Sequence, residues 1–122
     1  MCAGTMKRIL VVGTADTKGE ELAYLRSAIA DAGAVPIVVD VGIGAPGCAV
    51  DISRSEVAGE DADKILAGRD RGAAVAAMGE AFATFLTRFD AFDGIIGIGG
   101  GGGTSIITRG MRALPIGRPR TV

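Results

Sequence analysis

A run of five glycines is the feature of the chain with the clearest chemical potential. It spans Gly99–Gly103 and is followed by Thr104 and Ser105. Amides without side chains beside them can approach a phosphate closely, and hydroxyls at the start of a following helix add donors at its positive end. Each glycine costs about 0.5–1 kcal/mol relative to alanine in regular structure, so the run needs a compensating role. A phosphate-binding loop is the favoured role, and a flexible hinge or tight turn is the alternative. The predicted ligand-binding residues here are Gly99, Gly100, Gly101, Gly102, Gly103, Thr104 and Ser105.

The glycine run also satisfies a dinucleotide-binding spacing, G-x-G-x-x-G, through Gly97, Gly99 and Gly102. That spacing is almost unavoidable within a glycine run, so it discriminates poorly. The fingerprint further requires an acidic residue about 20 positions on to bind the ribose hydroxyls. Residues 104–122 contain none, which disfavours NAD as the ligand of this loop.

A second polar loop, Gly13–Glu20, follows the first apolar run. It lacks the glycine-lysine-Ser/Thr order of a P-loop, yet it brings two hydroxyls, the Asp16 carboxylate and an ammonium to a strand end. Lys18 is suited to neutralising phosphate charge, and Asp16 to holding magnesium through water. The alternative is that Thr14, Asp16 or Thr17 only caps the next helix. The predicted nucleotide ligands here are Gly13, Thr14, Asp16, Thr17 and Lys18, with Asp16 as the metal ligand.

Four further charged residues are candidates for the same site. Asp40 closes the second strand, where it either accepts a hydrogen bond from a ribose hydroxyl or simply ends the strand. Asp51 and Arg54 lie in a long glycine-containing loop, either as lid residues or as solvated charges. Arg109 is expected to join Lys18 in supplying positive charge.

Short β-branched runs that are apolar on both faces predict strands buried in a parallel sheet. The expected strands are 8–13, 35–41 and 95–98, and a fourth is expected to start at 119–122. Apolar residues spaced three and four apart predict helices between these strands. The expected helices are 18–32 with Gly33 as C-cap, 72–89 and 104–111, with short helical pieces at a capping box in 53–56 and at 61–66.

This alternation predicts an α/β, Rossmann-like three-layer fold with a parallel sheet, apparently truncated at the start of strand four. Ligands of such sheets bind beyond the carboxyl ends of the strands. If the strand order is 2-1-3, the loops after strands one and three face one crevice. Residues 1–122 are therefore expected to form the N-terminal portion of a nucleotide-binding α/β domain.

Composition excludes several classes of function. The formal net charge is -1 and aromatic residues make up 4% of the chain. The chain therefore lacks the excess of positive charge and the aromatic stacking residues that are typical of nucleic-acid-binding proteins. Without histidine, a His-based triad is excluded, and the two cysteines lack metal-ligand spacing. Free thiols and the lack of an apolar run of about 20 residues predict a cytoplasmic protein without a membrane span.

Taken together, the motifs resemble those of the Tm-one-like ATP-binding domain family, named for a tomato factor that inhibits tobamovirus RNA replication. Gly101 departs from the family's pattern, which often has serine at that position. The stretches that carry the resemblance are 13–19 with Leu22 and Leu25, 51–53, 70–72, 94–104 and 111–117.

The resemblance implies an ATP-binding domain longer than this chain, a second α/β domain and a homodimer. In plant members it implies a fused TIM-barrel, phosphoenolpyruvate-hydrolase-like domain. With the loop chemistry above, the favoured ligand is Mg-ATP, that is, ATP with Mg²⁺. The alternatives are a phosphoryl- or acyl-transfer enzyme with Asp16 as metal ligand or general base, an interaction factor whose nucleotide stabilises a dimer, and an inactive truncated product.

Overall fold

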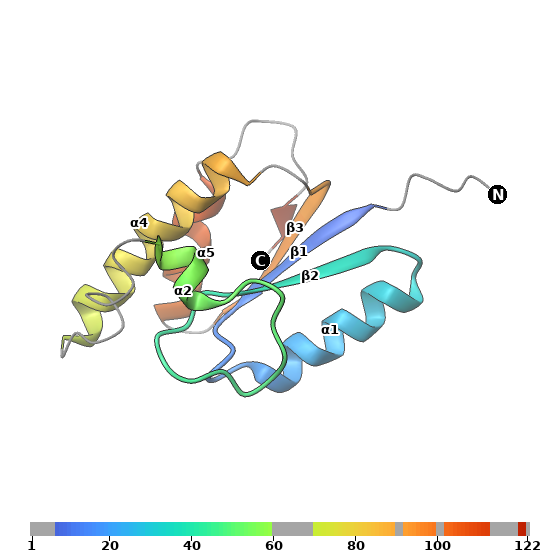
Figure 1. Cartoon of the computed structure of the whole chain (residues 1–122), viewed down its shortest axis with the longest axis horizontal. Helices are drawn as coiled ribbons and strands as arrows, with labels where there is room; N and C mark the ends of the chain where they lie inside the picture. The colour runs from blue at the N-terminus through green and yellow to red at the C-terminus, as the bar shows by residue number, and fades with distance from the viewer. Residues whose placement is uncertain (1–6, 60–69, 90–91, 100–101, 113–119, 122) are drawn as a thin grey trace.

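A parallel sheet with strand order β2-β1-β3-β4 forms the centre of the computed structural model (Figure 1). The structure describes residues 7–59, 70–89, 92–99, 102–112 and 120–121. The strands are β1 Arg8–Gly13, β2 Val35–Asp40, β3 Gly94–Ile98 and the two-residue β4 Arg120–Thr121. The predicted α/β class, parallel sheet and 2-1-3 order are confirmed, and β4 begins where a fourth strand was expected.

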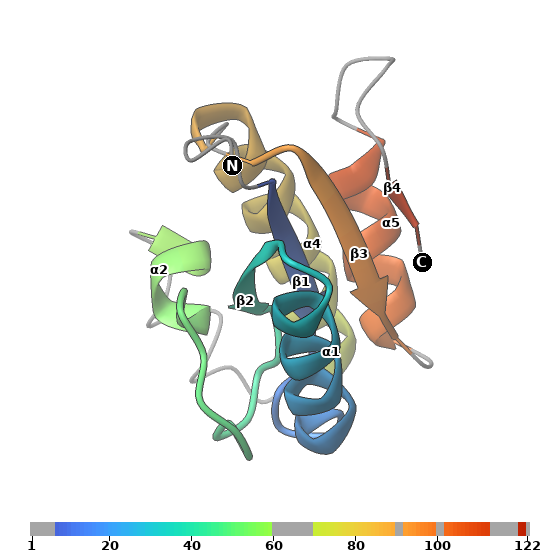
Figure 2. The ribbon, with the colours of Figure 1, turned by 90° about the vertical axis from the view of Figure 1, so that its right-hand side faces the viewer.

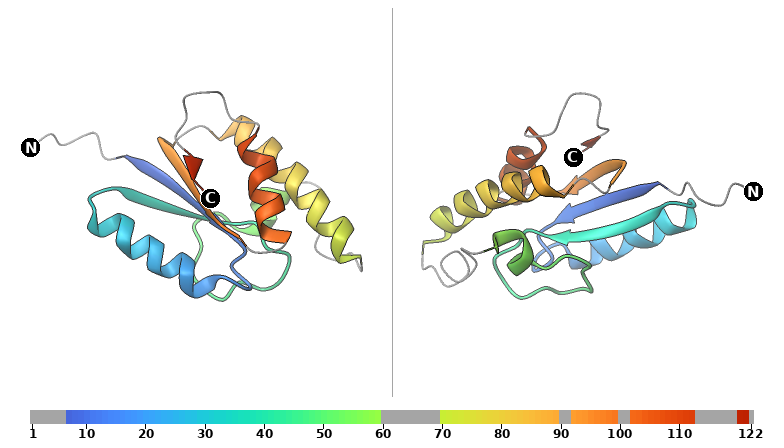
Figure 3. Two further views of the ribbon diagram at one scale, coloured as in Figure 1. Left: turned by 180° about the vertical axis from the view of Figure 1, so that it is seen from behind. Right: turned by 45° about the horizontal axis from the view of Figure 1, so that its top comes forward.

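The helices cover both faces of this sheet. They are α1 Gly19–Asp31, α2 Arg54–Ala58, α4 Arg71–Arg88 and α5 Gly102–Met111. Figures 2 and 3 show α1 on one face and the α4–α5 pair on the other. Right-handed crossovers require this division, because the chain moves from β1 to β2 in one direction and from β2 to β3 in the other.

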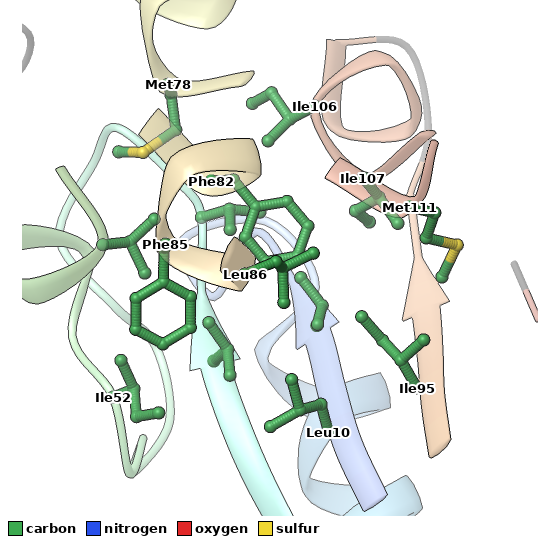
Figure 4. Close-up of a cluster of buried hydrophobic side chains, with 14 of the residues drawn as sticks. Leu10, Ile52, Met78, Phe82, Phe85, Leu86, Ile95, Ile106, Ile107 and Met111 are labelled. Carbon is green, nitrogen blue, oxygen red and sulfur yellow. The ribbon is translucent and has the colours of Figure 1, made fainter. Parts of the chain in front are cut away.

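Alternate residues of β1 contribute to two hydrophobic clusters, one on each face of the sheet. Val11 packs with Leu22 of α1, whereas Leu10 and Val12 belong to the larger cluster that contains Phe82 of α4. Figure 4 shows this larger cluster between the sheet and the α4–α5 pair. Because side chains alternate along a strand, one apolar segment holds both helical layers in place.

Two helix boundaries differ from the sequence expectation. The C-cap of α1 is Ala32, and Gly33 follows it with φ of 92°, the left-handed backbone that glycine adopts most readily. More important for function, α5 begins at Gly102, so Gly102 and Gly103 lie in its first turn. The expectation that the loop extends to Gly103 is wrong. The helical piece expected at 61–66 lies outside the described residues.

The outer edge of β2 is covered by the segment Asp51–Ile52. Ile52 forms a parallel bridge with Val39, and the amide nitrogen of Asp40 donates to the Ile52 carbonyl at 3.0 Å. The predicted capping box follows directly, with the Ser53 hydroxyl accepting from the amide of Glu56 at 3.2 Å. The long loop after β2 therefore has a fixed path back to the sheet.

Candidate functional site

The turn after β1 is compact and internally hydrogen-bonded. The amides of Thr17 and Lys18 both donate to the Thr14 carbonyl, at 3.1 and 2.7 Å. The hydroxyls of Thr14 and Thr17 lie 2.7 Å apart, so one donates to the other and the second hydroxyl proton is left for another acceptor. Lys18 is the N-cap of α1, and no side chain caps that helix. The alternative in which Thr14, Asp16 or Thr17 merely caps α1 is therefore wrong.

A cavity of about 250 Å³ opens beside this turn, at the carboxyl ends of β1 and β2. The register aligns these ends, since Gly13 pairs with Asp40 on one side and with Ile98 on the other. Polar groups of the turn face an apolar wall across the cavity. Its lining consists of Thr14, Asp16, Thr17, Lys18, Val41, Gly42, Ile43, Val75, Gly103 and Ile106.

The first turn of α5 closes the cavity opposite the β1 turn. Gly103 is buried, and a methyl group added to it would lie 3.2 Å from Thr14 Cγ2. One added to Gly99 would lie 2.5 Å from the amide nitrogen of Thr104. The backbone at the start of α5 therefore excludes a side chain at Gly99, and the Thr14 side chain leaves little room for one at Gly103. Gly100 and Gly101 lie outside the described residues.

Asp16 reaches from the β1 turn to the turn after β2. Methyl groups added to Gly42 and Gly44 would lie 2.5 Å from its Oδ1 and 2.7 Å from its Oδ2. Oδ1 is buried and receives no hydrogen bond from the described protein atoms. The lack of side chains at Gly42 and Gly44 thus leaves room for the Asp16 carboxylate, whose Oδ1 has no hydrogen-bond partner among the described atoms.

Asp40 lies behind the cavity lining and is only 1% exposed. Its Oδ1 accepts from the amides of Ala15 at 3.1 Å and Gly42 at 2.8 Å. Burial raises the pKa of Asp40; these two hydrogen bonds oppose the rise, and the nearby Asp16 carboxylate adds to it. Of the two roles expected for Asp40, the structure supplies the structural one directly, and the ribose role stays a prediction.

Several predicted residues are not brought to this cavity. Thr104 is half-buried outside its lining, and Ser105 is exposed. Ser105 instead lines a groove of about 380 Å³ between α4 and α5, together with Arg109. Glu80 holds Arg109 there through a bidentate ion pair at 2.8 and 2.9 Å. The expected partnership of Lys18 with Arg109 is therefore not formed.

The charges of the long loop make contacts that stabilise its fold. Asp51 Oδ2 accepts from the amide of Val38 at 2.8 Å and pairs with Arg26 at 3.1 Å. The Arg54 guanidinium donates to the Gly44 carbonyl. Asp51 nevertheless remains exposed, as a solvated loop charge would be, and a lid role for Asp51 and Arg54 stays a prediction.

Sequence reasoning missed the apolar half of the cavity. Val41, Gly42 and Ile43 come directly after the second strand, so the rule that ligands bind at carboxyl ends could have found them. Val75 of α4 and Ile106 of α5 carry no such signal, because their helical spacing predicts only core packing.

A model described as "Uncharacterised protein family (UPF0261) N-terminal domain" matches residues 7–122. The chain belongs to this family. A UPF0261 protein of Rhizobium meliloti (strain 1021) is 58% identical over 120 residues, which cover 96% of this chain and 30% of the relative. One from Clostridium tetani is 37% identical, covering 95% of this chain and 30% of the relative.

A plant protein that is similar to this chain confirms the resemblance found in the motifs. The ToMV susceptible protein tm-1(GCR26) of Solanum lycopersicum is 31% identical over 94% of this chain. That match covers 18% of the tomato protein. This UPF0261 chain thus spans about 30% of the length of the bacterial relatives above, and the model that it matches is that of the family's N-terminal domain. Among its described helices, none has the length and apolar character needed to cross a bilayer.

Proposed function

We propose that this UPF0261 domain binds Mg-ATP, with the phosphates in the cavity between the β1 turn and the first turn of α5. The observation that supports it is the convergence of Lys18, a free hydroxyl proton from the Thr14–Thr17 pair and the glycine start of α5 around one space. An ammonium, a hydroxyl and helix N-terminal amides are the groups that bind phosphate in proteins.

Each part of the cavity has a separate task in this proposal. The positive end of α5 and the Lys18 ammonium attract the phosphate oxygens, and the absence of a side chain at Gly103 lets them approach. Ile43, Val75 and Ile106 offer the apolar surface against which a purine packs.

The residues present also suit the magnesium ion that accompanies ATP. Asp16 is a hard oxygen ligand on the cavity wall, and its buried Oδ1 has no hydrogen-bond partner among the described atoms. Magnesium would neutralise phosphate charge when bound. Lys18 and the α5 amides orient the phosphates beside it.

Calorimetric titration of the chain with ATP in excess Mg²⁺ tests the proposal. Lys18→Gln should weaken ATP binding by about tenfold or more, because a charge-assisted contact is lost. Lys7→Gln is the matched control. Lys7 is exposed and lies just before the first residue of β1, so it is at the opposite end of that strand from the cavity.

A second variant places a negative charge directly in the proposed phosphate site. Gly103→Asp introduces a carboxylate in the first turn of α5, where the helix dipole favours it and phosphate is repelled. Gly103→Ala is its control, because it adds the same Cβ 3.2 Å from Thr14 Cγ2 without the charge. An ATP affinity unchanged in both Lys18→Gln and Gly103→Asp would remove the nucleotide from this cavity.

For the full-length protein we propose a cytoplasmic homodimer, and association with a TIM-barrel phosphoenolpyruvate-hydrolase-like domain where one is present. The support is the family resemblance, together with the free thiol of Cys48, which fits a reducing compartment. Light scattering of a full-length relative tests the dimer, and a monomeric mass would contradict it.

A further inference from the structure

Two carboxylates approach the same point beside Gly42, one from the cavity wall and one from behind it. Asp16 follows β1 and Asp40 ends β2, and both face the same point beside Gly42. A methyl carbon built on Gly42 would lie 2.5 Å from Asp16 Oδ1 and 3.0 Å from Asp40 Oδ1. Two negative charges are therefore held near each other in a mostly buried position, which is unfavourable unless a positive group lies between them.

Each carboxylate keeps one buried oxygen without a partner. Asp16 Oδ1 and Asp40 Oδ2 receive no hydrogen bond from the described atoms, and Asp40 is 1% exposed. The nearby Arg54 donates to the Gly44 carbonyl, and its buried Nε also has no partner. No ion pair within 4.0 Å reaches either carboxylate in the described part of the chain, where the ion pairs are Arg26–Asp51 and Arg109–Glu80.

We propose that Asp16 and Asp40 together bind a divalent cation, between the turn after β1 and the turn after β2, before any nucleotide is present. This inference rests on the proposed function only in taking the adjoining cavity as the nucleotide site. Arg54 offsets part of the paired negative charge, and a net attraction for a cation remains. Two hard oxygen ligands that leave positions for water or phosphate are typical of a magnesium site.

This arrangement explains why residues 42 and 44 are glycines. Any side chain at Gly42 would occupy the point between the two carboxylates, and one at Gly44 would press on Asp16 Oδ2. A cation bound there would join the two turns, because one carboxylate comes from each, and it would present its remaining positions to the cavity that Asp16 lines. Phosphate would then meet Lys18 on one side and the metal on the other.

The test is a titration of the chain with Mn²⁺ alone, in the absence of nucleotide, with free Mn²⁺ measured by electron paramagnetic resonance. We expect one bound ion that Mg²⁺ displaces. Asp16→Asn and Asp40→Asn should each weaken Mn²⁺ binding by about tenfold or more. Asp31→Asn is the matched control, since Asp31 is an exposed carboxylate at the last residue of α1.

A second readout keeps the proposal testable where Asp40→Asn alters the fold. Asp16 accepts no hydrogen bond from a backbone amide within the described residues, so Asp16→Asn should fold normally. Mg²⁺ should raise the thermal midpoint of the wild-type chain and not that of Asp16→Asn. Failure of the wild-type chain to bind Mn²⁺ without nucleotide, or equal binding by Asp16→Asn, would overturn the inference.

The two proposals fail in different ways. If ATP binds in a Lys18-dependent manner and Mn²⁺ alone does not bind, the nucleotide site stands and the preformed cation site falls. If Mn²⁺ binds through Asp16 and Asp40 and ATP does not bind, the cation site stands and the nucleotide proposal falls.

Discussion

The carboxylate of Asp40 accepts a hydrogen bond from the amide of Ala15 at 3.1 Å, and this contact fixes the end of β2 to the turn after β1. The same oxygen accepts from Gly42 at 2.8 Å. One buried atom therefore helps to hold together the two turns that frame the cavity, beside the backbone hydrogen bonds from Val41 to Gly13 and from Gly47 to Ala15. The geometry of the site depends on this oxygen, although Asp40 does not line the cavity.

Removing that oxygen should be costly. Asp40→Ala leaves two buried amide donors without an acceptor, and each such group costs about 1–3 kcal/mol. We expect a fall of about 2–4 kcal/mol in the free energy of unfolding, measured by urea denaturation. Asp40→Asn keeps an acceptor oxygen and should lose less than half as much. An equal loss in the two variants would show that the hydrogen bonds are not the cause.

The charge of Asp40 should give stability a particular pH dependence when divalent cations are removed with EDTA. Burial raises the pKa of Asp40 above its ordinary value of 3.8, so the folded state holds this proton more tightly than the unfolded state. Between the ordinary and the raised pKa the folded state binds more protons, and the free energy of unfolding therefore falls as pH rises. Above the raised pKa this penalty is constant.

Comparison with Asp40→Asn isolates that contribution from those of other carboxylates. The stability of Asp40→Asn minus that of the wild-type chain should increase as pH rises from below 3.8, and then level off. Urea midpoints measured at a series of pH values give this difference. A difference that stays constant or decreases would contradict the raised pKa.

The sheet and the edge that carries the site could be predicted from the sequence. Apolar β-branched runs identify β1, β2 and β3, and the carboxyl-end rule places the turn at Thr14–Lys18 beside the start of α5. These elements could be predicted because the local pattern of apolar residues and the order of strands and helices along the chain determine them.

Side-chain direction and long-range contacts could not be predicted in the same way. Ser105 and Arg109 lie on the face of α5 that meets α4, away from Lys18, and this depends on the helix beginning at Gly102. The ends of a helix are the least certain part of a sequence-based assignment. Asp51 bonds the Val38 amide 13 positions away, a contact without a local signal.

Gly99 should be intolerant of a side chain for steric reasons. An added methyl group would lie 2.5 Å from the Thr104 amide nitrogen and 2.8 Å from the Gly103 carbonyl carbon, which are backbone atoms that cannot rotate away. We expect Gly99→Ala to lower the free energy of unfolding by about 1–3 kcal/mol, as overpacking does elsewhere. Gly72→Ala in α4 is the control, because its nearest contact is Asp70 Oδ1 at 3.4 Å. Urea denaturation that gives Gly99→Ala a stability equal to that of Gly72→Ala would contradict the close approach of β3 to α5.

The packing of α4 on α5 should distinguish two glycines within one interface. A methyl group on Gly110 of α5 would collide with the ring of Phe82, which is fully buried. Gly110→Ala should therefore lower the free energy of unfolding by about 1–3 kcal/mol.

On the facing helix, a methyl group on Gly79 would meet Arg109 and Ile106 at 3.7 Å, an ordinary contact distance. Gly79→Ala should then raise stability by about 0.5–1 kcal/mol through the lower backbone entropy of the unfolded chain. Thermal and urea unfolding of both variants measure the contrast, and a shift of the same sign in both would mean that the interface does not close on Phe82 as described.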